Sequence, residues 1–235
     1  MNVFAATKKG RNKDHSDDRI VIGDIVLNNE CRLFENISPK IIGISDGVGG
    51  NAGGNIAAQF ICERSTLLPN DDLLQNAADI NTELLRYSSE VKGKEKMAAT
   101  FSAIIFGGDT KIIHIGNTRI YAVQGGYLKQ LTNDQTTYNM LRFRGLNEEA
   151  ENCNKSELVS CFGGGTERLF SPQIIDVSAP KKIVMTSDGI HDHVDIDSIE
   201  EIISSEKSCR EKSDELIQKA LDNGSCDDLS IVFVW

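Results

Sequence analysis

Short apolar runs that end at polar or glycine-rich turns dominate the hydrophobic pattern of this 235-residue chain. A strand that is covered on both faces needs no alternation, so each run of β-branched and aliphatic residues predicts a buried strand. These strands are expected at 20–27, 39–45, 174–177, 182–186 and 229–235. Four more runs are joined by short connectors, most of them containing glycine, and predict an antiparallel meander. They lie at 98–106, 111–115, 119–123 and 127–131.

Apolar residues spaced three and four apart predict helices between these strands. One helix should follow the glycines of 47–54 to about residue 68, and a second should begin at the cap Asn70-Asp71-Asp72. Two more are expected near 195–204 and 208–223, the latter ended by Gly224. Periodicity is weak from 132 to 172, which predicts a loop-rich insertion with one or two short helices. The pattern as a whole predicts a single α+β domain over 1–235.

Composition narrows the class of protein. The chain is 40% hydrophobic and 26% charged, which is typical of a globular domain. A net charge of −10 and a pI near 4.9 argue against a nucleic-acid partner. The apolar runs are too short for a membrane helix, and the N-terminus lacks the order of a signal peptide. Six cysteines without a Cys-x-x-Cys pair indicate reduced thiols, so we expect a cytoplasmic protein.

Carboxylates stand at the ends of several predicted strands. Asp46 and Asp188 each lie in Ser-Asp-Gly directly after an apolar run, and Asp227 precedes the last strand. Asp14 is a fourth candidate, from the N-terminal segment. Carboxylates gathered in one pocket repel one another unless metal ions supply compensating charge. If these four converge, the sequence predicts a site for a hard divalent cation.

A set of ordered motifs resembles the metal-dependent serine/threonine phosphatases of the protein phosphatase 2C family, in their compact bacterial form. Residues 45–54 read Ser-Asp-Gly-Val-Gly-Gly-Asn-Ala-Gly-Gly and resemble the family's Asp-Gly-x-Gly-Gly…Gly-Gly signature. The other motifs occur in the family's order and span essentially the whole chain. They are Thr100-Phe101-Ser102, Gly116-Asn117-Thr118-Arg119, Leu131-Thr132-Asn133-Asp134, Ser187-Asp188-Gly189-Ile190 and Asp227-Asp228-Leu229-Ser230.

The resemblance implies a four-layer α-β-β-α sandwich, in which two antiparallel sheets are flanked by helices. It implies two Mn²⁺ or Mg²⁺ ions, with Asp46 bridging both and the carbonyl of Gly47 holding one. Asp188 and Asp227 would complete one metal, and Asp14 would lie on the other side, largely through water. Asp46, Asp188 and Asp227 would thus be the catalytic residues.

The resemblance also implies the chemistry and the partners. A water that bridges the two ions would attack phosphoserine or phosphothreonine in proteins phosphorylated by a Ser/Thr kinase, without a Cys or Ser nucleophile. Residues 135–172 would form a flap over the metal site and be the most mobile segment. We expect a monomer with no nucleic-acid or membrane partner.

Three positions depart from the family pattern. Lys9 stands where an arginine usually clamps the substrate phosphate, five residues before the first metal ligand, and Arg11 is the nearest arginine. A lysine loses the bidentate contact of a guanidinium. Asn117 replaces an aspartate that helps hold a third ion, so a third ion would bind weakly, with Asp192 as its remaining ligand. Asp228 replaces an asparagine and adds a negative charge.

Two alternatives to the phosphatase remain open at this stage. Lys9 and Asn117 also fit a weak or inactive phosphatase-like domain that binds phosphoproteins as a sensor or scaffold. A metal-assisted hydrolase of small phosphomonoesters is the other. The proton donor to the leaving group is also open, with His15, His191 and His193 near the right motifs.

Overall fold

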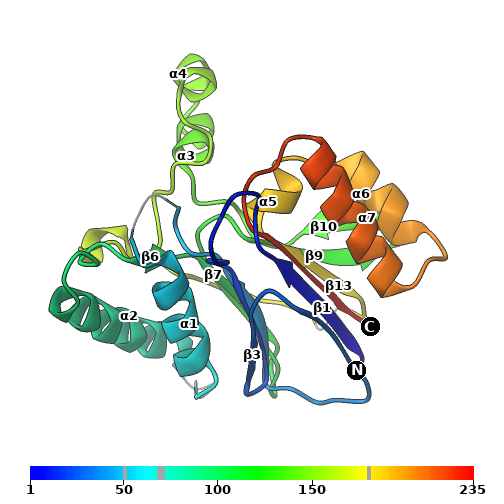
Figure 1. The fold of residues 1–235 in the computed structure, drawn as a ribbon, viewed down its shortest axis with the longest axis horizontal. Helices are drawn as coiled ribbons and strands as arrows, with labels where there is room; N and C mark the ends of the chain where they lie inside the picture. Colours follow the sequence, from blue (N-terminus) through cyan, green and yellow to red (C-terminus); the bar gives the residue numbers. More distant parts are fainter. Residues whose placement is uncertain (50–51, 68–71, 179–180) are drawn as a thin grey trace.

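Two six-stranded antiparallel sheets lie against each other in the computed structural model, and helices cover both outer faces (Figure 1). The structure describes residues 1–49, 52–67, 72–178 and 181–235. The first sheet has the order β10-β9-β13-β14-β1-β4. Its strands are β1 (Val3–Lys8), β4 (Cys31–Phe34), β9 (Arg119–Gln124), β10 (Tyr127–Gln130), β13 (Ile183–Thr186) and β14 (Leu229–Val234).

The second sheet has the order β12-β8-β7-β5-β2-β3. Its strands are β2 (Arg19–Ile22), β3 (Ile25–Leu27), β5 (Ile41–Ser45), β7 (Phe101–Ile105), β8 (Lys111–Ile115) and β12 (Gln173–Asp176). A separate short pair is formed by β6 (Ala98–Ala99) and β11 (Phe162–Gly163).

Helices form the two outer layers. On the second sheet lie α1 (Gly54–Ser65) and α2 (Leu73–Glu90), and on the first lie α5 (Asp188–His191), α6 (Ile196–Ser204) and α7 (Cys209–Asp222). Caps fix their starts, since the Asp72 carboxylate accepts from the Gln75 amide at 3.0 Å and Ser208 forms a capping box with Glu211. The predicted α-β-β-α sandwich is therefore confirmed.

Three buried clusters explain why the strands read as unbroken apolar runs. In β5, Ile42 and Ile44 pack between the two sheets, whereas Ile41 faces α1 and α2. A strand buried on both faces has no solvent side that would select polar residues. On the first sheet, Tyr121 and Phe233 pack under α6 and α7.

The predicted meander over 98–131 is wrong. The pairs β7–β8 and β9–β10 are hairpins, but β8 and β9 lie in different sheets. The chain turns at Gly116, whose φ of 104° and close approach to the Thr100 side chain exclude other residues. The segment 116–118 thus crosses between the sheets and carries Asn117 to the edge where the carboxylates gather.

Other boundaries also differ from the expectation. The run 20–27 is a β2–β3 hairpin because Gly23 turns it with a φ of 61°, and strands β1 and β4 were not predicted. Leu74 in the first turn of α2 and Ile196 in the first turn of α6 are 53% and 43% exposed, although both are large apolar residues. Gly50 and Asn51 of the glycine motif, and Asn70 and Asp71 of the predicted cap, lie outside the described residues.

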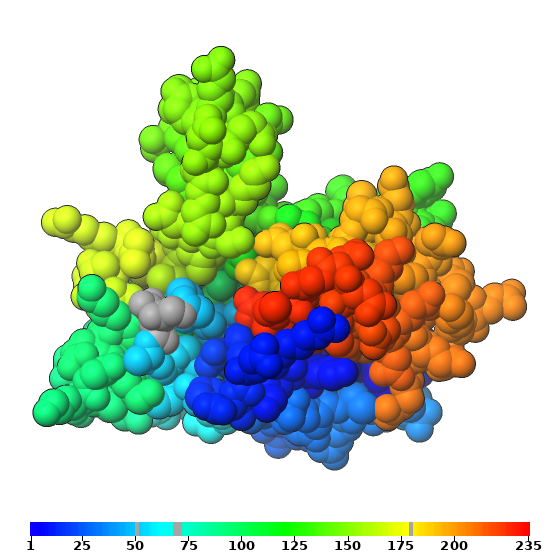
Figure 2. Space-filling model, turned by 45° about the horizontal axis from the view of Figure 1, so that its top comes forward, coloured from blue at the N-terminus to red at the C-terminus, as the bar shows by residue number. Residues whose placement is uncertain are grey.

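The segment 135–172 carries two helices that project from the body. They are α3 (Thr137–Phe143) and α4 (Asn147–Asn152), and Figures 1 and 2 show them standing clear of the sheets as an arm. The remainder returns to the body through β11 and the 3-10 turn η1 (Glu167–Leu169). Phe162 of β11 is buried against Phe101.

No helix in the described parts of the chain is both long enough and apolar enough to span a membrane.

Candidate functional site

Strand ends place four aspartates at one edge of the two sheets. Asp46 follows β5, Asp188 opens α5 just after β13, and Asp227 lies just before β14. The fourth is Asp18, directly before β2, which pairs with β5 so that Arg19 faces Ser45. The charges of Asp18, Asp188 and Asp227 all act on Asp46. With Asp228 these residues form a group that we call the acidic cluster.

Asp46 is held at this edge by its backbone. Its amide donates to the Thr100 hydroxyl at 3.1 Å, and its carbonyl accepts from the Thr100 amide at 2.8 Å. Burial first, and then the charges of its carboxylate neighbours, raise the pKa of Asp46 well above its usual range. Burial and the charge of Asp227 raise the pKa of Asp188 as well. Two such carboxylates repel each other unless one of them is protonated or a cation lies between them.

The glycines after Asp46 permit a close backbone contact. A Cβ on Gly47 would lie 2.5 Å from the Gly54 carbonyl carbon, so the strand end and the start of α1 touch through their backbones. Residues with side chains at either position would push α1 away from the edge. The start of α1 therefore packs directly against the residue that follows Asp46.

Asp18 is the site residue that sequence reasoning missed. It is fully buried, its Oδ2 accepts from the Ser230 hydroxyl at 2.6 Å, and its Oδ1 has no hydrogen-bond partner. Burial and the charges of Asp228, Asp188 and Asp227 raise the pKa of Asp18 to about 7. The sequence does indicate Asp18 in one respect, because this residue stands just before an apolar run, as Asp227 does.

Asp14 does not join the acidic cluster. Its side chain is exposed in the loop before β2, and only its backbone carbonyl is contacted, by Lys9 Nζ at 3.5 Å. Arg11 is exposed too. None of the three N-terminal residues predicted to bind metal or phosphate, which are Lys9, Arg11 and Asp14, forms a side-chain hydrogen bond or ion pair with the described carboxylates of the cluster.

Lys13 is the basic residue that reaches the cluster. Its Nζ lies 2.6 Å from Asp227 Oδ1 and 2.9 Å from Asp228 Oδ2. It precedes Asp18 by five residues, the spacing that the family pattern gives to the phosphate-binding arginine. Burial opposes the charge of Lys13, but the hydrogen bonds and charges of Asp227 and Asp228 outweigh it and raise its pKa.

Asp228 fixes the N-terminal loop to the last strand. It is 1% exposed, and its two oxygens accept from the amides of Gly10 and Asp17 at 2.8 and 2.7 Å. A Cβ on Gly10 would overlap the backbone of Cys226 and Asp227, so the loop also passes in close backbone contact with that strand entry. Both ends of the loop that carries Lys13 are thus anchored.

Asn117 and Asp192 both lie near Asp188. The Asn117 amide nitrogen donates to Asp188 Oδ2 at 2.9 Å, while Asp192 accepts from Ser156 at 3.4 Å. Partial burial and the charge of Asp188 raise the pKa of Asp192. Both residues line a hollow of about 380 Å³ beneath the arm, with Lys155 of the arm at its rim.

The motifs quoted from the sequence contact one another around this edge. The Arg119 guanidinium donates three hydrogen bonds to Asp134, the shortest at 2.6 Å, so two of the motifs are joined by one ion pair. The Thr100 and Thr118 hydroxyls lie 2.9 Å apart. These contacts orient the crossing segment that presents Asn117.

Comparisons with known proteins agree with this geometry. The serine/threonine phosphatase Stp of Listeria monocytogenes serotype 4b is 24% identical over 250 residues, which cover 100% of this chain and 95% of that protein. The serine/threonine protein phosphatase PstP of Mycobacterium tuberculosis is 28% identical over 221 residues, covering 89% of this chain and 42% of that protein. No family model matches the chain.

The fold was compared as well. The crystal structure of the serine/threonine phosphatase Stp1 from Staphylococcus aureus aligns with a TM-score of 0.80 at 23% identity, over 98% of this chain and 93% of that one. The chain is thus similar, over most or all of its length, to proteins named serine/threonine phosphatases. The solved structure shares its fold.

The donor set of the acidic cluster fits divalent cations. Oδ1 of Asp18 and Oδ1 of Asp188 are buried without a partner, which costs free energy unless a cation or water satisfies them. Burial first, and then the repulsion between the carboxylates, raises the pKa of Asp18, Asp46 and Asp188, and a bound cation would offset that repulsion. In the described part of the chain, no three His, Cys, Asp or Glu side chains already adopt a closed ligand geometry.

The histidines near these motifs differ in environment. His15 is exposed, and His191 is buried with Nδ1 2.8 Å from the Thr186 hydroxyl. Burial first and then the Arg119 charge hold the pKa of His191 well below its usual range, so it is neutral and a poor proton donor. The carbonyl of His193 accepts from Asn223.

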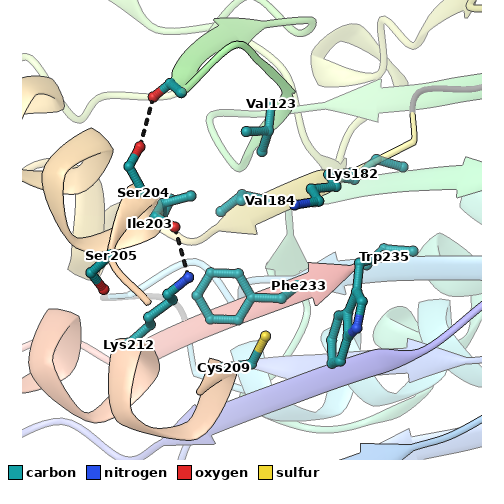
Figure 3. A pocket seen from close by; sticks show the side chains of 13 residues that line it. Val123, Lys182, Val184, Ile203, Ser204, Ser205, Cys209, Lys212, Phe233 and Trp235 are labelled. Carbon is teal, nitrogen blue, oxygen red and sulfur yellow. Dashed lines mark hydrogen bonds between the residues drawn. The ribbon is translucent and has the colours of Figure 1, made fainter. Parts of the chain in front are cut away.

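A second hollow of about 430 Å³ lies at the other end of β14 (Figure 3). Val184 and Phe233 line it together with Trp235, and Lys212 at its edge donates to the Ile203 carbonyl at 2.8 Å. No carboxylate side chain lines it. Because the acidic cluster lies at the Leu229 end of the strand, the two sites are separated by its length.

Proposed function

We propose that this chain is a metal-dependent phosphoprotein phosphatase that hydrolyses phosphoserine and phosphothreonine. The observation that carries the proposal is the acidic cluster, to which four distant segments each bring an aspartate at the same sheet edge. A binding-only module has no need to keep buried carboxylates that destabilise one another. The similarity of the chain to proteins named serine/threonine phosphatases supports the same activity.

The ligands we propose are Asp18, Asp46, the Gly47 carbonyl, Asp188 and Asp227, for two Mn²⁺ or Mg²⁺ ions. Asp46, which interacts with all three other carboxylates, would lie between the ions. Hard oxygen donors suit both cations. When bound, the ions supply an activated water and the charge that offsets the phosphoryl oxygens.

A third, weaker ion would use Asn117 and Asp192. They lie beside Asp188 and line the same hollow.

Residues of the chain supply orientation and further charge. Lys13, in place of Lys9 or Arg11, is the cation we assign to the substrate phosphate, because it alone of the three contacts the cluster. As an ammonium it offers charge without the fork of an arginine. Asn117 orients Asp188 by its hydrogen bond, and Thr100 fixes the Asp46 backbone. The projecting arm borders the hollow at Asp192 and would act as the flap over the bound substrate.

The biological setting follows from the chemistry. The partners would be proteins phosphorylated by a Ser/Thr kinase. The six free cysteines support a reducing, cytoplasmic compartment. We propose a monomer with a single catalytic domain over 1–235.

The test is hydrolysis of a phosphothreonine peptide and of p-nitrophenyl phosphate, each with Mn²⁺, with EDTA, and with Mn²⁺ restored. We expect turnover that EDTA abolishes and Mn²⁺ restores. The Asp46→Ala, Asp188→Ala double variant should lose at least about a thousandfold in kcat because its metal ligands are gone. Wild-type activity no higher than that of the double variant would contradict the proposal. A preference for small phosphomonoesters over phosphopeptides would contradict the substrate class.

A further inference from the structure

Lys13 is the basic side chain that forms ion pairs with the acidic cluster. Its ammonium bridges Asp227 and Asp228 at 2.6 and 2.9 Å and lies 3.7 Å from Asp17. Among the residues that the structure describes, no other Lys or Arg forms an ion pair with the cluster. One ammonium therefore supplies the charge that a divalent ion would supply at Asp227.

The two carboxylates that Lys13 bridges are not equivalent. Asp228 is buried and is also held by the Gly10 and Asp17 amides, which flank Lys13 in the sequence. The Asp227 side chain is 46% exposed, and its second contact is only the next backbone amide, at 2.8 Å. Asp228 thus anchors the loop, whereas Asp227 can exchange its partner without disturbing that anchor.

A divalent ion and the ammonium cannot both occupy Asp227 at low cost. Oxygen ligands approach such ions to about 2.0–2.6 Å. The Lys13 nitrogen already lies 2.6 Å from Oδ1, so a metal there would meet a positive charge at short range. Either the ammonium leaves, or the metal binds more weakly.

We propose that Lys13 is an exchangeable counterion, which neutralises Asp227 until a metal displaces it and then swings about Asp228 to receive an anion. This inference rests on the proposed function, because it needs a metal at Asp227. It makes metal binding and phosphate binding interdependent through a single side chain. The buried charge of Asp228, where the family pattern has an asparagine, keeps the released ammonium at the site.

The first test measures Mn²⁺ binding by isothermal titration calorimetry for wild type, Lys13→Met and Lys9→Met. Lys9 is the matched control, since its ammonium contacts only a backbone carbonyl at 3.5 Å. We expect Lys13→Met to bind Mn²⁺ about three- to tenfold more tightly, because no ammonium must be displaced. Lys9→Met should match wild type. An unchanged or weaker Mn²⁺ affinity in folded Lys13→Met would overturn the proposal.

The second test uses wild-type protein and does not depend on a variant folding. Lysines are labelled with an amine-reactive ester, in EDTA and in saturating Mg²⁺, and quantified by mass spectrometry. Labelling of Lys13 should rise severalfold with Mg²⁺ while labelling of Lys9 stays constant. Constant labelling of Lys13 would refute the exchange even if the wild type is an active phosphatase. Absence of metal-dependent hydrolysis would instead refute the proposed function itself.

Discussion

Asp18→Asn is expected to reduce phosphopeptide hydrolysis by about 100-fold or more, because it removes a charged oxygen ligand from the acidic cluster. Asp14→Asn is the matched control: it makes the same chemical change four residues away in the same loop. Asp14 is exposed and has no side-chain contact in the cluster, so its substitution should change kcat/KM by no more than about twofold. Steady-state assays at saturating Mn²⁺ measure both effects.

The reverse result would contradict the structural assignment. If Asp14→Asn lost activity and Asp18→Asn retained it, the exposed loop would have to refold around the metals. Circular dichroism of both variants separates loss of a ligand from loss of the fold. Mn²⁺ titration gives a second readout, since Asp18→Asn should weaken metal binding and Asp14→Asn should not.

Stability of the metal-free protein should depend on pH through Asp18. Its pKa in the folded protein is about 7, against an ordinary value of 3.8, so folding favours the protonated form. Such a group gives its full stability below the unfolded value and loses it as pH rises to about 7. Asp18→Asn imitates the protonated carboxyl and should therefore unfold at a higher temperature than wild type in EDTA at pH 8.

The pH series isolates this effect from other titrations. Burial also lowers the pKa of His114 and of His191, which opposes the trend, but both histidines are present in wild type and variant alike. The difference in melting temperature should therefore shrink steadily from pH 7 toward pH 4. Saturating Mn²⁺ should reverse its sign, because metal favours the ionised wild type. A difference that is constant across this range in EDTA would show that Asp18 is not the titrating group.

Three site aspartates were predictable from the sequence for a physical reason. Asp46 and Asp188 end unbroken apolar runs and Asp227 precedes one, and a strand buried on both faces fixes where its end emerges. Asp18 obeys the same rule before β2. Asp14 was assigned instead, because the short N-terminal loop holds three aspartates. Only their burial in the folded protein distinguishes them. Because the first aspartate was placed at Asp14 instead of Asp18, the phosphate-binding position five residues earlier was placed at Lys9 instead of Lys13.

The incorrect predictions about the fold concern contacts between distant residues, which no local sequence pattern indicates. Helices and most strands could be placed from periodicity and caps, such as Asp72 and Ser208. The partner of each strand depends on how the two sheets stack, so the crossing at Gly116 looked like another hairpin turn. Strand β1 was missed because its small residues Ala5, Ala6 and Thr7 give a weak apolar signal, although they are buried.

The central claim is that the acidic cluster binds the catalytic metals, and anomalous diffraction from crystals soaked in Mn²⁺ tests it most directly. The account predicts two peaks roughly 3.5–4 Å apart, with Asp46 between them and Asp18, Asp188 and Asp227 as further ligands. Lys13 should no longer contact Asp227 in that structure. Peaks absent from the cluster, or a metal held by Asp14 with Asp18 uninvolved, would contradict the account.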